Sequence, residues 1–126
     1  MKTYPDLPDS EFTVMKIIWS RPAPVSGTQI AGLAAPEHGW KPQTVHTFLN
    51  RLVEKGFLST EKKGKERFYT PLVLRDAYFN QATERFMNTF YKNSLKGFMN
   101  AFFSGSVNED KLSELEEWFE ENSKNL

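Results

Sequence analysis

The chain has 126 residues and no cysteine, and its 16 Lys and Arg balance its 16 Asp and Glu. This length fits one domain of typical size, or a small domain with an assembly appendage. A hydrophobic content of 39% and an aromatic content of 14% are ample for a core, which excludes global disorder. Without cysteine, the sequence excludes disulfides, thiol catalysis, zinc fingers and thiolate metal sensing.

The apolar runs span only a few residues, and the N-terminal stretch MKTYPDLPDSE lacks the apolar region of a signal peptide. We therefore expect a cytoplasmic protein without membrane insertion. The zero net charge conceals an asymmetry. Residues 1–75 hold 11 Lys and Arg against 7 Asp and Glu, whereas residues 76–126 hold 5 against 9. This favours a polyanionic partner for the first half alone, although chance segregation would give the same balance.

Two short helices are predicted first. Asp9 is a good N-cap for a helix that runs to about Ser20, where a proline-rich stretch stops it. Ser26, with Gln29 three residues later, forms a capping-box pattern. It opens a second helix that ends near Ala35.

A third helix follows a turn over residues 36–39. It begins near Pro42 and ends at Lys55, with Gly56 as the expected left-handed residue after it. Its apolar residues recur at i, i+3, i+4 and i+7, so this face should be buried against the first two helices. These residues are Val45, Phe48, Leu49 and Leu52.

The outward face of the third helix carries side chains that can read base edges in a DNA major groove. Gln and Asn can pair with adenine, Arg with guanine, and a threonine methyl with the thymine methyl. A lysine at the helix start would lie beside a phosphate. An ordinary solvated helix face would explain the same pattern. The candidate DNA-binding residues here are Lys41, Gln43, Thr44, His46, Thr47, Asn50 and Arg51.

A β-hairpin is predicted next, with strands over residues 57–61 and 66–70 joined by residues 62–65. An isolated hairpin is only marginally stable in water, so we expect this one to pack against the helices. Four cations surround Gly64. Directly after a polar-faced helix, they favour a phosphate clamp over a merely solubilising turn. These candidate phosphate-binding residues are Lys62, Lys63, Lys65 and Arg67.

The second half predicts three helices, which begin near Leu74, at Ser94 and at Asn108. Residues 74–126 contain ten of the 18 aromatic side chains, more than three short helices can bury. Such a surface marks an interface, and a two-fold homodimer is the commonest assembly. Packing onto the first half in a monomer is the alternative. The candidate interface residues are Tyr78, Phe79, Phe86, Phe90, Leu95, Phe98, Met99, Phe102, Leu115 and Phe119.

No catalytic, metal-binding or cofactor-binding constellation emerges. His38 and His46 have no carboxylate at ligand spacing, and the glutamates over residues 114–121 are typical of a solvated helix face. A Gly-rich phosphate loop is absent. The sequence therefore favours a protein that is not an enzyme and that has neither a metal site nor a cofactor.

Together these residues resemble the penicillinase-repressor family (BlaI and MecI type) of bacterial transcriptional regulators. The main marker is the run KPQTVHTFLNRLVEKG from Lys41 to Gly56, and further matches are Asp9-Ser10-Glu11 and Tyr69-Thr70-Pro71-Leu72. The resemblance implies a mainly α fold with a small β-hairpin wing. It also implies an N-terminal winged helix-turn-helix DNA-binding domain (residues 1–73) and a C-terminal helical dimerisation domain (residues 74–126).

The resemblance further implies a homodimeric repressor on a pseudo-palindromic operator of double-stranded DNA, often in a β-lactam resistance operon. In such systems a membrane-bound sensor protease triggers cleavage inside the dimerisation domain, typically at an Asn-Phe pair. The aligned candidate cleavage site here is Ala101-Phe102, which departs from that pattern. A winged-helix protein–protein interaction module without sequence-specific DNA binding is the alternative function.

Overall fold

The computed structural model describes residues 3–105 and 107–125. It divides into two compact units, Met1–Ala82 and Thr83–Leu126, which are described in turn. The element order is α1 (Asp9–Trp19), β1 (Val25–Ser26), α2 (Gly27–His38), α3 (Pro42–Glu54), β2 (Leu58–Lys63), β3 (Glu66–Pro71), α4 (Arg75–Tyr91), α5 (Leu95–Gly105), α6 (Glu109–Asn122) and the 3-10 turn η1 (Ser123–Asn125).

The first helix, α1, lies almost where the sequence predicts it. The residue at the N-cap is Pro8 rather than Asp9, and the Pro8 carbonyl accepts the Phe12 amide at 2.9 Å. Asp9 and Glu11 occupy the first turn, where anions interact favourably with the helix dipole. The helix ends at Trp19, close to the predicted Ser20.

The second helix, α2, confirms the predicted N-cap but continues past the predicted end. The Ser26 hydroxyl accepts the Gln29 amide at 3.1 Å. The helix then runs through Pro36 to His38, where a turn was predicted. The residue that ends it is Gly39, whose φ of 65° lies in the left-handed region and whose amide binds the Ala35 carbonyl. A proline in the last turn removes only one intrahelical hydrogen bond, so it does not by itself end α2.

The third helix, α3, ends as predicted. Gly56 has a φ of 81°, its amide binds the Val53 carbonyl at 3.1 Å, and the Phe57 amide binds the Leu52 carbonyl at 2.9 Å. These two bonds form a Schellman motif, which needs the left-handed residue that glycine supplies most easily. Phe57 is thereby turned into the core, and the chain enters β2 directly.

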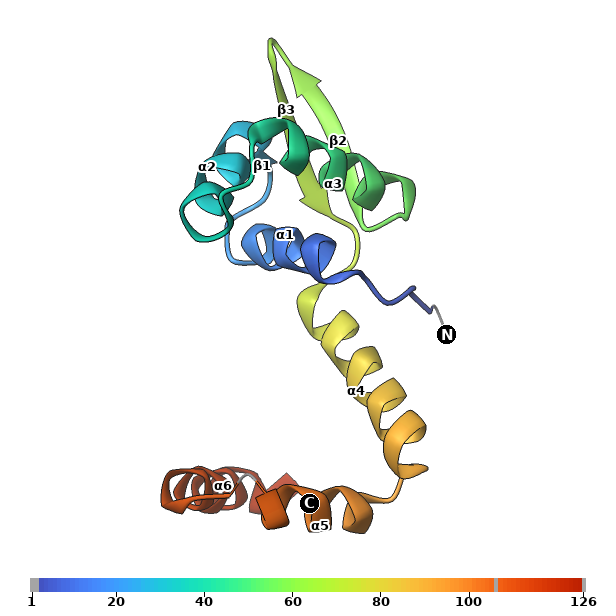
Figure 1. Ribbon diagram of the computed structural model, residues 1–126, viewed down its shortest axis with the longest axis vertical. Coiled ribbons are helices and arrows are strands. Elements are labelled where there is room, and N and C mark those ends of the chain that lie inside the picture. Colours follow the sequence, from blue (N-terminus) through green and yellow to red (C-terminus); the bar gives the residue numbers. More distant parts are fainter. Residues whose placement is uncertain (1–2, 106, 126) are drawn as a thin grey trace. The chain divides into compact units, whose positions relative to one another are not determined.

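The wing is the hairpin β2–β3, extended to a three-stranded antiparallel sheet in the order β1-β3-β2 (Figure 1). Lys63 pairs with Glu66, so the connection is a two-residue turn over Gly64 and Lys65, shorter than the predicted four residues. Gly64 has the positive φ of 66° that such a turn requires at its first position. The strand β1 was not predicted, because two residues alone carry no strand pattern.

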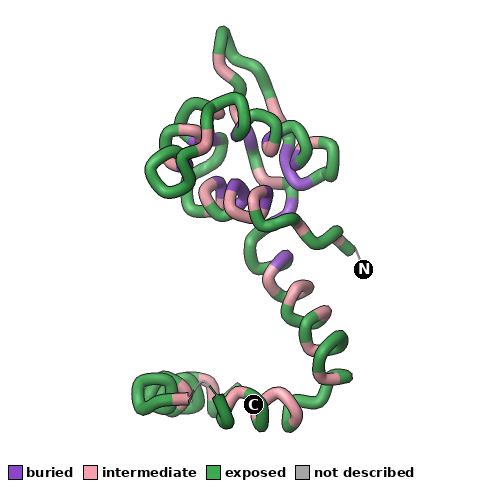
Figure 2. Tube along the Cα trace, viewed as in Figure 1, coloured by how far each residue is buried: buried purple, intermediate pink, exposed green. Residues whose placement is uncertain are grey.

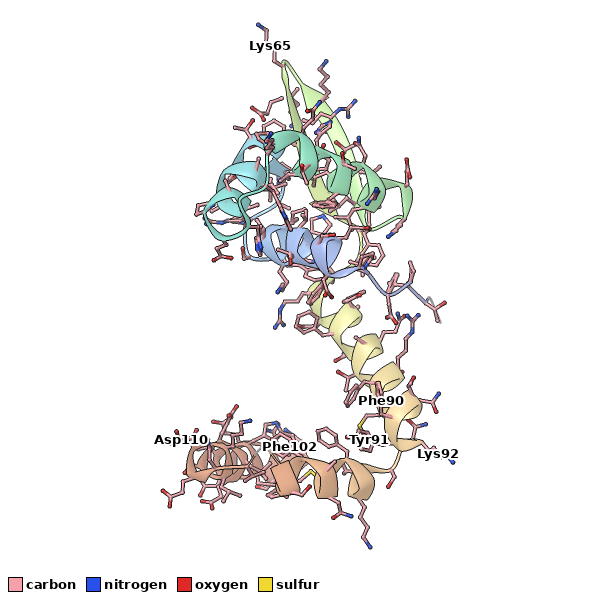
Figure 3. All side chains as sticks on the ribbon, viewed as in Figure 1. Lys65, Phe90, Tyr91, Lys92, Phe102 and Asp110 are labelled. Atoms are coloured by element: carbon pink, nitrogen blue, oxygen red, sulfur yellow. The ribbon has the colours of Figure 1, made fainter. Side chains whose placement is uncertain are left out.

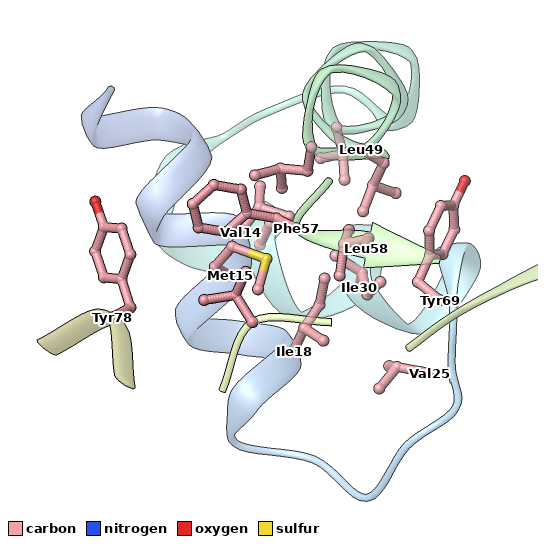
Figure 4. Packing of buried hydrophobic residues seen from close by; sticks show 14 residues of the cluster. Val14, Met15, Ile18, Val25, Ile30, Leu49, Phe57, Leu58, Tyr69 and Tyr78 are labelled. Carbon is pink, nitrogen blue, oxygen red and sulfur yellow. The ribbon is translucent and has the colours of Figure 1, made fainter. Parts of the chain in front are cut away.

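The buried apolar side chains of the described residues form one core, and all of it belongs to the first unit (Figures 2 and 4). Helices α1, α2 and α3 each contribute one face, and the sheet contributes Val25, Leu58 and Tyr69. The cluster comprises Val14, Met15, Ile18, Val25, Ile30, Ala34, Val45, Leu49, Leu52, Phe57, Leu58, Tyr69, Val73 and Tyr78.

The start of α4 belongs to this first unit, and it carries two of the aromatic residues predicted for a dimer interface, Tyr78 and Phe79. Tyr78 is only 6% exposed, and its ring lies 5.7 to 5.8 Å from those of Phe12, Trp19 and Phe57. Its hydroxyl oxygen accepts the Leu7 amide at 2.8 Å. Phe79 packs on Phe12 and Trp19. These rings complete the core of their own chain, so the compact unit extends to Ala82 and not only to residue 73.

The second unit contains the rest of α4 with α5 and α6. Lys92 and Asn93, both with positive φ, separate α4 from α5. The predicted caps are confirmed: the Ser94 hydroxyl accepts the Gly97 amide at 3.0 Å, and the Asn108 side chain accepts the Lys111 amide at 2.9 Å. Among the described residues of this unit none is buried, so its apolar side chains line a surface rather than a core.

Candidate nucleic-acid interface

Helix α3 presents a polar face to solvent. Val45, Leu49 and Leu52 are at most 1% exposed and hold its inner face against the core. All the predicted reading residues are exposed on the other sides of the helix, namely Lys41, Gln43, Thr44, His46, Thr47, Asn50 and Arg51. The amphipathic pattern thus determines which side chains of α3 would face a DNA groove.

The start of α3 is suited to a phosphate. Lys41 occupies the N-cap without a side-chain capping hydrogen bond, and Pro42 follows at the first helical position. The positive end of the helix dipole therefore lies beside a lysine. Farther along, the Thr47 hydroxyl donates to the Gln43 carbonyl at 3.1 Å, which leaves the threonine methyl and the lone pairs of the hydroxyl oxygen for a partner.

The wing brings a second set of cations to the same unit. Lys62, Lys63, Lys65 and Arg67 are all exposed, and Lys65 lies at the tip of the hairpin (Figure 3). In the part of the chain that the structure describes, none of the four forms an ion pair with a carboxylate. Their charges therefore remain available to an external anion. A DNA backbone offers such anions at regular spacing.

A groove of about 580 Å³ lies between α2, the first half of α3 and β3. Small residues of α2 form one wall, among them Gly27 and Ala31, and Trp40 and His46 form part of another. Arg67 and Tyr69 contribute from β3. The groove thus lies between α2 and two elements that carry candidate DNA-binding residues, α3 and β3.

Tyr69 supplies a buried polar atom to this region. Its ring is 1% exposed, and its hydroxyl has no hydrogen-bond partner among the described residues. The neighbouring Thr60 hydroxyl donates instead to the Phe68 carbonyl. Burial raises the pKa of Tyr69 above its usual value, while Thr60 and the Arg67 charge act in the opposite direction. Figure 4 shows the hydroxyl pointing away from the other labelled core side chains.

Two contacts of carboxylate groups position these elements, and sequence patterns did not reveal them. The Glu11 carboxylate, which is 2% exposed, binds Lys55 Nζ just after α3. The Glu66 carboxylate, on the wing, accepts hydrogen bonds from the amide and the hydroxyl of Thr28 at the start of α2. Both join residues that are about 40 positions apart in the chain, so no local signal marks them.

The histidines have local roles. His38 stacks on Trp40 with the ring centroids 4.5 Å apart, and its Nε2 lies 3.7 Å from a Glu37 carboxylate oxygen. His46 lies on the exposed side of α3. No group of three or more side chains suited to a metal ion occurs among the described residues. The same residues contain no helix long and apolar enough to cross a bilayer.

The candidate interface residues of the second unit are only partly covered by their own chain. Phe86, Phe90, Leu95 and Phe119 are between 43% and 67% exposed. Phe98, Met99, Phe102 and Leu115 are half-buried and line a groove of about 370 Å³ between α5 and α6. Apolar residues outside the predicted set are as exposed, and these are Phe103, Leu112 and Trp118.

The candidate cleavage pair lies inside α5. Ala101 is exposed, whereas Phe102 is half-buried and stacks on Phe98 with the ring centroids 5.8 Å apart. Lys111 Nζ, from α6, lies 5.4 Å from the centroid of the Phe102 ring. Figure 3 shows Phe102 on α5 and Asp110 on α6. The helical backbone must unwind locally before a protease can bind this bond in an extended form.

Comparison with known proteins agrees with this geometry. The family model described as "Penicillinase repressor" matches residues 7–121. The penicillinase repressor of Bacillus licheniformis is 33% identical over 95 residues, which cover 75% of this chain and 73% of that protein.

Solved structures agree as well. The solution structure of the DNA-binding domain of the repressor BlaI superimposes with a TM-score of 0.54 at 33% identity, over 62% of this chain and 94% of that one. The Bacillus licheniformis BlaI monomeric form, solved in complex with the blaP half-operator, gives a TM-score of 0.53 at the same identity and coverage. The predicted winged-helix fold is thereby confirmed. The chain belongs to the penicillinase repressor family, and it is a DNA-binding transcriptional repressor rather than an enzyme.

Proposed function

We propose that the chain acts as a homodimer that binds a pseudo-palindromic operator and represses a β-lactam resistance operon in the cytoplasm. The observation that carries the DNA-binding part is the exposed polar face of α3 beside wing cations that form no ion pair among the described residues. The helix would enter the major groove and read base edges, while the wing binds backbone phosphates. The resistance operon is proposed because the relatives are a penicillinase repressor and a BlaI bound to the blaP half-operator.

The assignment of roles follows from the chemistry of each side chain. Gln43, Asn50 and Arg51 can form paired hydrogen bonds with base edges, and Thr44 and Thr47 can contact thymine methyl groups. His46, near the start of α3, lines the groove that lies between α2, α3 and β3. The phosphate contacts fall to Lys41 and to the four wing cations, Lys62, Lys63, Lys65 and Arg67. Only the first group would distinguish one sequence from another.

The homodimer is supported by the composition of the second unit. A unit whose described residues include several apolar side chains between 40% and 67% exposed, and none that is buried, lacks a core of its own. Patches of this kind mark an interaction surface, and a second copy of the same chain covers it with two-fold symmetry. A dimer would place two reading helices about 34 Å apart, which matches successive major grooves.

Repression would be steric, because a dimer that covers a promoter excludes the polymerase. We propose that a membrane-bound sensor protease ends repression by cutting at Ala101-Phe102, which would separate α6 from most of α5. This part rests on the family resemblance alone. A chain that ends at Ala101 should therefore sediment as a monomer and bind operator DNA weakly, because each half-site would be held independently.

A band-shift titration on DNA from upstream of its own gene tests the proposed function. We expect a discrete complex that survives excess unrelated DNA, with protection of two half-sites about one helical turn apart. Affinity should fall with salt by a log–log slope of about 0.9 for each phosphate neutralised. Equal affinity for operator and unrelated DNA, or an affinity that salt does not change, would instead indicate a protein-interaction module.

A further inference from the structure

The wing is attached to the helix-turn-helix through a very short ladder. Strand β3 pairs with β1 at only two positions, Val25 with Tyr69 and Ser26 with Phe68. Beyond them, the hairpin continues towards its tip with β2 as its only paired strand. A two-stranded hairpin is marginally stable by itself, so the orientation of the tip depends on side-chain contacts outside the ladder.

Glu66 makes a contact of this kind. It is the first residue of β3 and is separated from the ladder with β1 by a single residue. Its Oε1 accepts the Thr28 amide at 3.2 Å and the Thr28 hydroxyl at 2.5 Å. Thr28 lies in the first turn of α2, which has no acidic residue of its own. The carboxylate therefore completes the N-terminal capping that Ser26 begins, and it lies where the helix dipole stabilises an anion.

The same contact leaves the wing lysines free. In the described part of the chain, Glu66 bonds to Thr28 and forms no ion pair with Lys62, Lys63 or Lys65. Close packing supports the junction at the neighbouring position, because a Cβ added at Gly27 would lie 3.5 Å from the Tyr69 ring and 3.9 Å from the Arg67 carbonyl. The acidic group thus binds the helix rather than neutralising the cations around it.

We propose that Glu66 is a positioning residue that holds the wing against α2, so that the wing lysines and the reading face of α3 meet DNA as one surface. This inference rests on the proposed DNA binding. By charge alone, a carboxylate among phosphate-binding lysines repels DNA, and its removal would tighten binding. Positioning predicts the opposite sign, because a loosened wing binds fewer phosphates.

The test compares operator binding by the full-length chain and its variants at several salt concentrations. Glu66→Ala should bind the operator about five- to tenfold more weakly, and its salt slope should fall by about 0.9 for each phosphate that the loosened wing no longer neutralises. Glu66→Gln, which keeps the accepting oxygen, should recover most of the affinity. Glu61→Ala is the matched control, because Glu61 is an exposed wing carboxylate on β2, and its removal should leave affinity unchanged or raised.

A double-mutant cycle locates the effect at the contact itself. Thr28→Val should weaken binding in the wild-type background and add little in the Glu66→Ala background, because Glu66→Ala already removes the hydroxyl–carboxylate bond that Thr28→Val removes. Equal or tighter operator binding by Glu66→Ala, or equal effects of Glu66→Ala and Glu61→Ala, would overturn the positioning role while the wild type still binds. Failure of the wild-type chain to bind any DNA would overturn the proposed function together with it.

Discussion

Lys55 Nζ donates to the Glu11 carboxylate, so the residue directly after α3 is held to the first turn of α1. Glu11 is 2% exposed, whereas the Lys55 side chain is 32% exposed. Replacement by Lys55→Met would leave a carboxylate buried without its partner. We expect a loss of about 1–3 kcal/mol in the free energy of unfolding, measured by urea denaturation. Lys62→Met, at an exposed site that has no ion pair in the described part of the chain, should change this free energy little, and equal losses in both variants would contradict the role of the pair.

Arg51 is expected to contribute to sequence discrimination. It is exposed on α3, and an arginine that binds a guanine edge through two hydrogen bonds supplies about 1–3 kcal/mol of preference over the wrong base. Arg51→Ala should reduce the ratio of operator to unrelated-DNA affinity by that amount in competition titrations. Glu54→Ala, at the last residue of α3, is the control, since a carboxylate there should lie outside the groove. An unchanged ratio in Arg51→Ala would remove Arg51 from the reading set.

Lys63 is expected to act on all DNA alike. Its ammonium group is exposed on β2 and has no carboxylate partner among the described residues. Lys63→Ala should weaken operator and unrelated DNA by the same factor and lower the salt slope by about 0.9. Lys96→Ala, on α5, should leave both quantities unchanged. A change in sequence preference with Lys63→Ala would mean that the wing reads bases.

The signals that the sequence revealed are local ones. Ser26, Ser94 and Asn108 cap helices within three residues of themselves, and Gly56 ends α3 through bonds confined to one turn. The amphipathic face of α3 likewise follows from its own spacing. For these features, residues that are close together in the sequence determine the local structure, so the sequence alone is sufficient to predict them.

The features that sequence reading missed depend on distant residues. Strand β1 exists because β3 pairs with it. Glu66 accepts a hydrogen bond from Thr28, and the two residues are separated by 38 positions in the chain. Tyr78 was expected at a dimer interface because it lies in an aromatic-rich half, yet it fills a gap beside Phe12. Periodicity shows that a side chain is apolar and inward-facing, but it does not show which unit receives it.

Tyr69 offers a test of the unpaired hydroxyl. Because that buried group has no partner among the described residues, Tyr69→Phe should leave stability at pH 7 unchanged or raise it by about 1 kcal/mol. Burial raises the pKa of Tyr69, so the folded state binds this proton more tightly than the unfolded state. The associated stability is therefore complete below pH 10 and is lost as the pH rises through the folded-state pKa. Urea denaturation at increasing alkaline pH should show a steeper loss for the wild type than for Tyr69→Phe, and parallel losses would exclude this residue as the cause.

Phe90 tests the proposed dimer without disturbing the monomer. Its side chain is 67% exposed and touches Phe86 of its own chain at a ring separation of 5.0 Å. A charge at this position costs little in a free monomer but is desolvated when a second copy covers it. Phe90→Asp should therefore give monomers in sedimentation at micromolar concentration while the helical circular dichroism stays the same. Thr89→Asp, the adjacent exposed position on α4, controls for the added charge and should remain dimeric.

Operator affinity should fall together with dimerisation in Phe90→Asp, because two linked half-site contacts bind far more tightly than one. Dimers of unchanged stability would place the interface away from Phe90.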